Sequence, residues 1–65
     1  MMSTEERIEN GLITLITIDE LSHIPGYEWQ GVEPVVIDGE RHFITIYIDV
    51  FKQFYGILDS EVNHD

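Results

Sequence analysis

Residues 35–48, which read VVIDGERHFITIYI, decide the fold. Asp38-Gly39 supplies the positive φ angles of a two-residue hairpin turn, and β-branched and aromatic residues flank it on both sides. The stretch therefore predicts a β-hairpin that turns at these two residues. Because side chains alternate along a strand, one face of the hairpin is assigned to the core, and it carries Val35, Ile37, Ile44, Ile46 and Ile48.

The opposite face of this hairpin is less polar than a freely solvated sheet face usually is. The same alternation gives it Val36, Arg41, Phe43, Thr45 and Tyr47. We therefore expect something to cover this face. A homodimer is the simplest cover.

The N-terminal part predicts a short helix followed by a strand. Ser3 and Glu6 have the spacing of a capping box, which starts a helix at Thr4. Gly11 is a good helix stop, but the apolar spacing continues through it, so residues 4–16 are either one helix or a helix and a strand. We favour the second interpretation, because residues 12–18 are mostly β-branched or leucine.

The segment between this strand and the hairpin predicts a helical turn and then a loop. Thr17 and Glu20 form a second possible capping box, and Pro25-Gly26 ends any helix there, which leaves a turn at about 18–24. Residues 25–34 show no period and are expected to form a loop that carries Tyr27 and Trp29.

The C-terminal part predicts a helix and a loose tail. Asp49 is a good N-cap, and the apolar residues at 50, 51, 54, 57 and 58 fall on one helical stripe. We expect a helix over about 50–58 that packs on the hairpin, and a polar tail over 59–65. Together these elements make one small α+β domain, residues 1–65.

Charge and composition restrict the classes of function. Thirteen acidic residues stand against Arg7, Arg41 and Lys52, so the formal net charge is −10. Such a surface repels nucleic-acid phosphates and attracts basic protein surfaces. A hydrophobic fraction of 43% indicates a folded chain rather than a disordered acidic one. The absence of cysteine suits the reducing cytoplasm, and no apolar run approaches the ~20 residues of a membrane span.

Neither catalysis nor cofactor binding is expected. Ser22 and His23 are adjacent in sequence, and neighbours on a helix point apart, so they make no nucleophile–base pair. Asp19 and His23 share a helical face, but His42 and His64 belong to other segments and do not complete a zinc site. We therefore predict no enzyme activity, cofactor or metal.

Two resemblances follow from the turn and cap residues. Ile18-Asp19-Glu20-Leu21, Pro34 to Phe43, and Asp49-Val50-Phe51 loosely resemble the small winged-helix proteins of the excisionase type, which place a helix in the major groove and a hairpin wing beside it. That resemblance implies a recognition helix at 25–34, yet this segment holds Glu28 and Glu33 and no Lys or Arg. The hairpin is also similar in outline to the small phage inhibitors of uracil-DNA glycosylase.

The leading hypothesis is a non-enzymatic acidic binding protein, encoded by a phage or mobile element, that inhibits or regulates a basic, nucleic-acid-binding protein. Carboxylates at phosphate-like intervals, with apolar residues among them, can occupy a basic groove by DNA mimicry. The alternatives are a degenerate excisionase-like regulator and a homo-oligomeric structural or assembly protein. The residues expected to bind the partner combine acids and aromatics: Glu28, Trp29, Glu33, Glu40, Phe43 and Tyr47.

Overall fold

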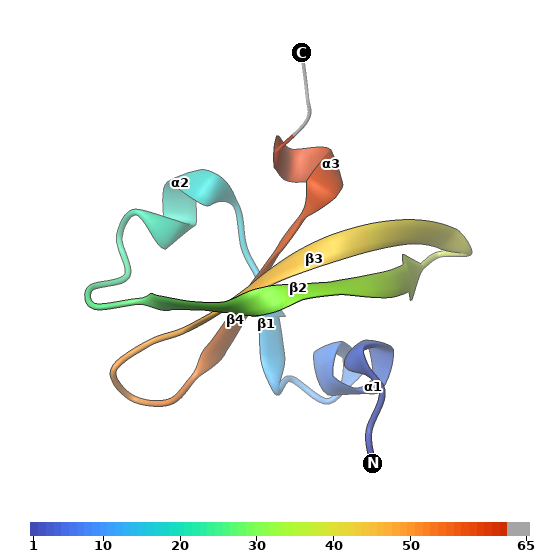
Figure 1. Cartoon of the computed structure of the whole chain (residues 1–65), viewed down its shortest axis with the longest axis horizontal. Coiled ribbons are helices and arrows are strands. Elements are labelled where there is room, and N and C mark those ends of the chain that lie inside the picture. Colours follow the sequence, from blue (N-terminus) through green and yellow to red (C-terminus); the bar gives the residue numbers. More distant parts are fainter. Residues whose placement is uncertain (63–65) are drawn as a thin grey trace.

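The computed structural model describes residues 1–62 as a four-stranded mixed sheet with short helices around it (Figure 1). The strand order is β1-β4-β3-β2, with β1 parallel to β4 and the other neighbours antiparallel. This arrangement confirms the α+β class. The elements in chain order are α1 (Thr4–Glu9), β1 (Ile13–Leu15), α2 (Ile18–Leu21), β2 (Glu28–Ile37), β3 (Glu40–Ile48), β4 (Phe54–Leu58) and α3 (Asp59–Val62).

The predicted hairpin is confirmed, with β2 and β3 as its arms. Ile37 pairs with Glu40 across a turn in which Asp38 and Gly39 have φ angles of 52° and 81°. The predicted core face is also confirmed. Val35, Ile44 and Ile46 are buried and form the core cluster with Ile13 of β1, and partly buried residues pack against it: Ile8, Ile37, Phe54 and Leu58.

Both capping boxes of the N-terminal part are present. Ser3 and Glu6 cap α1, and Thr17 and Glu20 cap α2, each pair by reciprocal hydrogen bonds between side chain and backbone. Gly11 has a φ of 77°, and the chain leaves α1 there before it enters β1. The helix-and-strand interpretation of residues 4–16 is therefore correct.

The predicted helix at 50–58 is wrong, because these residues form a loop and the strand β4. The Oδ1 atom of Asp49 accepts hydrogen bonds from the backbone N–H groups of Phe51 and Gln53, each at 2.9 Å. The interaction that was expected to cap a helix thus closes the turn between β3 and β4. Strand β4 then lies between β1 and β3, where Gly56 pairs with both Leu15 and Ile46.

The predicted loop at 25–34 is also wrong over most of its length, because β2 begins at Glu28. A β-bulge interrupts the pairing: Trp29 lies opposite Tyr47, and Gly31 lies opposite Ile46. The extra residue, Gln30, shifts the alternation of side chains between the two faces. The segment is therefore an extended strand although its sequence shows no regular alternation of apolar and polar residues.

Helix α1 is docked on β2 by polar contacts. The Glu5 carboxylate accepts a 2.8 Å hydrogen bond from the backbone N–H of Val36. The Nη2 atom of Arg7 lies 3.0 Å from Oε1 of Glu33, which also accepts a hydrogen bond from the Thr4 hydroxyl. Strand β2 is an edge strand, so these contacts also protect one side of the sheet.

The C-terminal residues continue from β4 into α3. The Nδ1 atom of His42 lies 2.9 Å from Oδ1 of Asp59 and joins α3 to β3. The loose tail predicted for 59–65 thus begins with a short helix, and residues 63–65 lie outside the described part of the chain. No helix within residues 1–62 is long and apolar enough to cross a membrane.

Candidate protein-binding face

The outward face of the β2–β3 hairpin carries a continuous set of exposed apolar side chains, which we call the aromatic face. Strand pairing places Trp29 opposite Tyr47, Pro34 opposite Phe43, and Val32 opposite Thr45. Directly paired residues point to the same side of a sheet, so these side chains share one surface. The aromatic face is defined by Trp29, Val32, Pro34, Val36, Phe43 and Tyr47.

The large side chains of this face are open to solvent. Trp29 is 63% exposed, Phe43 is 58% exposed, and Val32 and Val36 are each about half exposed. Single exposed apolar residues are ordinary, but neighbouring ones on a flat sheet are typical of interaction sites. The expectation of an unusually apolar second face is therefore confirmed for the hairpin.

The β-bulge brings Trp29 onto this face. In a regular strand, residue 29 would point to the same side as Val35, which is the core side. The extra residue Gln30 shifts the alternation by one, so the Trp29 side chain points to the opposite side. At the same end of the hairpin, Tyr47 meets Tyr27 edge to face, with ring centroids 5.4 Å apart. This contact buries part of Tyr47 and gives the aromatic face one fixed edge.

No carboxylate from β2 or β3 lies on the aromatic face. The one charged residue that these strands contribute is Arg41, which pairs with Val36 and is exposed. Although the chain holds thirteen acidic residues, none of those in β2 or β3 lies among the apolar side chains of this face. An apolar centre with charge kept to the margins is the usual anatomy of a protein interface.

The three glutamates predicted as partner-binding residues lie away from this face. Glu33 and Glu40 pair with Ile44 and Ile37, and therefore point to the core side. Glu33 is held by Arg7, whereas Glu40 is exposed and lies 3.7 Å from Nε2 of His42. Glu28 is exposed at the start of β2. The structure thus gathers Trp29, Phe43 and Tyr47 but not the acids.

Several carboxylates serve the fold rather than an open surface. Hydrogen bonds from its own backbone N–H and from that of Val36 lower the pKa of Glu5. The hydrogen bond from His42 lowers the pKa of Asp59. Burial by itself raises the pKa of Asp49, but hydrogen bonds from Gln53, Tyr55 and Phe51 together outweigh it and lower the pKa. Because these groups already have partners, they are poor candidates for phosphate mimicry.

Sequence reasoning missed Val32 and Pro34 as members of the face. Their segment shows no period and predicts a loop, and a proline argues against a central strand. Pro34 is accommodated because β2 is an edge strand. The backbone N–H of Val36 points away from β3, toward Glu5. Backbone nitrogens two residues apart in a strand point in the same direction, so the nitrogen of Pro34 also lies on the unpaired side, where no N–H is needed.

Two of the three histidines, His23 and His42, belong to the described residues, and His64 lies outside them. Within residues 1–62, no group of three or more His, Asp or Glu side chains is arranged to hold a metal ion. His42 contacts Asp59 and Glu40, while His23 is exposed beyond α2.

Comparison with known proteins gives no relative for this arrangement. No family model, curated protein or solved structure matches the chain.

Proposed function

We propose that this chain is a non-enzymatic binding protein whose aromatic face docks on a protein with a basic surface. The observation that carries the proposal is the separation of the aromatic face from the carboxylates in a chain of net charge −10. The apolar centre supplies contact energy, and the surrounding negative charge attracts and orients a cationic partner. Inhibition or regulation of a nucleic-acid-binding protein follows from occupation of its basic surface.

The exposed acids at the two ends of the hairpin support this arrangement. Asp38 and Glu40 lie at the turn, and Glu28 lies at the opposite end of β2. They lie beyond the two ends of the aromatic face, and strand pairing directs Glu28 and Glu40 to its opposite side. Lys or Arg side chains around an apolar pocket of the partner would meet these acids when the aromatic rings enter the pocket.

The test compares three captures from a lysate of the source cells, using the unmodified chain, Phe43→Ser and Phe51→Ser. Phe51 is the matched control because it is 78% exposed but lies in the β3–β4 loop, outside the two strands that form the aromatic face. We expect Phe43→Ser, but not Phe51→Ser, to lose the partner. We also expect the captured protein to be basic and to elute as salt rises, because screening weakens the attraction. Equal loss in both variants, or elution independent of salt, would contradict the proposal.

A homodimer through the same face is the second candidate. The observation that favours it is again the lack of carboxylates, because two copies can bring their aromatic faces together without opposing acids. The two candidates respond to salt in opposite ways. Two chains of charge −10 repel each other, so salt should strengthen a homodimer, whereas it should weaken a complex with a basic protein. Sedimentation at low and moderate salt separates them.

The excisionase-like alternative has less support. The segment 25–34, where that resemblance implies a recognition helix, includes the first part of β2 and no helix. Binding of a DNA duplex at low salt would still argue for it directly.

A further inference from the structure

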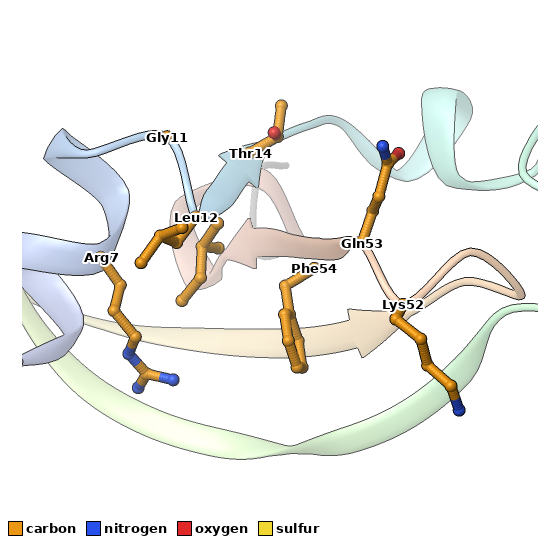
Figure 2. Close-up of a pocket in the computed structure, with 8 residues that line it drawn as sticks. Arg7, Gly11, Leu12, Thr14, Lys52, Gln53 and Phe54 are labelled. Atoms are coloured by element: carbon orange, nitrogen blue, oxygen red, sulfur yellow. The ribbon is translucent and has the colours of Figure 1, made fainter.

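A cleft of about 440 Å³ opens where the starts of β1 and β4 meet the end of α1 (Figure 2). Its apolar lining comes from Leu12, Ile13 and Phe54, and its polar lining includes Arg7 and Lys52. Figure 2 shows Phe54 between the Arg7 and Lys52 side chains. No residue of the aromatic face lines the cleft, so this site is separate from the proposed protein-binding face.

The cleft concentrates the scarce positive charge of the chain. Two of the three basic residues line it, although acidic residues outnumber basic ones thirteen to three. The Lys52 ammonium makes no ion pair within residues 1–62, and Arg7 uses its Nη2 atom for Glu33 and Thr4. The Nε atom of Arg7 is buried and has no hydrogen-bond partner within the same residues. Both cations therefore retain N–H donors for an anion.

The turn between β3 and β4 determines the backbone conformation of Lys52. Lys52 has a φ of 66°, a left-handed conformation that glycine adopts without strain and a lysine does not. The loop requires this conformation, because the carbonyl of Asp49 accepts the Lys52 N–H and the Asp49 side chain holds Phe51 and Gln53. The loop therefore fixes the backbone of Lys52 beside the cleft.

We propose that the cleft binds a small organic carboxylate with an apolar body. The carboxylate would pair with the Lys52 ammonium, and the body would pack on Phe54, Ile13 and Leu12, toward Arg7. A single negative charge is favoured over a phosphate dianion, because the net charge of −10 penalises each added charge. The volume lies within the range of about 300–1,000 Å³ that is typical of small-molecule sites.

The test is a titration of the ¹⁵N-labelled chain with 3-phenylpropanoate, followed by amide chemical shifts. We expect saturable shifts at Gly11, Thr14 and Gln53, with a Kd of about a few millimolar for a ligand of this size. The uncharged analogue 3-phenylpropanamide should bind about tenfold more weakly, because it lacks the charge-assisted contact. Equal binding of the two compounds, or no saturable shift at these residues, would overturn the proposal.

The matched variants are Lys52→Gln and Arg41→Gln, which make the net charge more negative by the same amount. Lys52 lines the cleft, whereas Arg41 is exposed on the aromatic side of the hairpin. We expect Lys52→Gln to weaken 3-phenylpropanoate by about tenfold and Arg41→Gln to leave it nearly unchanged. Equal weakening in both variants would reduce the effect to general electrostatics and overturn the assigned site.

Lys52→Gly separates binding from folding. Glycine relieves the left-handed backbone, so the melting temperature should stay the same or rise while 3-phenylpropanoate binding falls about tenfold. If Lys52→Gly kept the binding, the ammonium would have no role and the proposal would fail.

Discussion

Gly56 lies in β4 at a point where the core leaves no room for a side chain. A Cβ built on it would lie 2.8 Å from Cγ1 of Ile44 and 3.2 Å from Cγ2 of Ile13, and Cδ1 of Ile44 would be closer still. Both isoleucines are almost fully buried. The glycine thus allows the side chains of β1 and β3 to pack across β4.

Gly56→Ala is therefore expected to destabilise the protein by about 1–3 kcal/mol, as other overpacked cores do. The measurement is urea unfolding of four chains: unmodified, Gly56→Ala, Ile44→Val and the double variant. Ile44→Val removes the methyl group nearest to the new Cβ. The double variant should therefore lose less free energy of unfolding than the sum of the losses in the two single variants. Strict additivity would show that the contact is not the cause.

Asp49 links the acid sensitivity of the fold to one turn. Its Oδ1 atom holds two backbone N–H groups, and its Oδ2 atom accepts a 2.8 Å hydrogen bond from the Tyr55 hydroxyl. Its pKa is lowered in the folded state. A lowered carboxylate pKa stabilises the fold above the unfolded pKa of about 4, and this contribution is lost as pH falls through the lower folded value.

Asp49→Asn should therefore melt at a lower temperature than the unmodified chain at pH 7, and the difference should shrink as pH falls below about 4. Thermal melts between neutral and strongly acidic pH measure this. Asp38→Asn is the control, because it removes the same charge at a hairpin turn where asparagine also fits the left-handed backbone. A difference for Asp49→Asn that persists unchanged at low pH would contradict the assignment.

Glu5 is the contact through which α1 protects the edge of the sheet. Its carboxylate accepts the outward N–H of Val36, and Pro34 has no N–H to offer at the equivalent point two residues earlier. The backbone nitrogens of Pro34 and Val36, on the unpaired edge of β2, are thus not available to donate to another strand. The aromatic face remains open, while this part of the adjoining edge does not.

Glu5→Gln is expected to speed amide hydrogen exchange at Val36, because a neutral amide oxygen is a weaker acceptor than a carboxylate. Glu9→Gln provides the control, since Glu9 is exposed in the same helix and the charge change is identical. Exchange measured residue by residue should show faster exchange at Val36 in Glu5→Gln alone. The same rate at Val36 in both variants would argue against a role for this contact.

Elements defined by neighbouring residues could be predicted, and those defined by distant contacts could not. The two capping boxes and the Asp38-Gly39 turn act within four residues, and all three appear in the structure. Asp49 has the same local chemistry in a helix cap and in a turn, so it could not distinguish the two. Residues 54–58 form a strand because they pair with both β1 and β3, whose isoleucine side chains fill the space at Gly56. These contacts are distant in sequence, so no local pattern predicts them.

The predicted partner-binding residues divide in the same way. Phe43 and Tyr47 lie on the predicted outward face because the hairpin register was correct. Trp29 joins them only through the bulge at Gln30, and Glu33 is removed from the set by its long-range ion pair with Arg7. No local sequence pattern predicts the cleft at Lys52, because the cleft depends on the order of β1 and β4 in the sheet.

At the scale of the whole molecule, twelve of the thirteen acidic residues belong to residues 1–62, and the Cα radius of gyration is 11.5 Å. Their mutual repulsion opposes folding and acts over about 10 Å at 0.1 M salt. The melting temperature should therefore rise with sodium chloride between low and moderate ionic strength. An equal osmolality of sucrose serves as a control for non-ionic effects of the solute. A melting temperature that falls with salt would contradict a dominant role for repulsion.

The parallel pairing of β1 with β4 sets an order for folding during synthesis. Residues 13–15 are synthesised well before their partners at 54–56. The hairpin closes a much shorter stretch of chain, because its two arms are adjacent. The first strand must wait with its apolar side chains uncovered. A transcript that stops after β3 would yield a hairpin and a helix with an unpaired first strand, a species prone to aggregation and proteolysis.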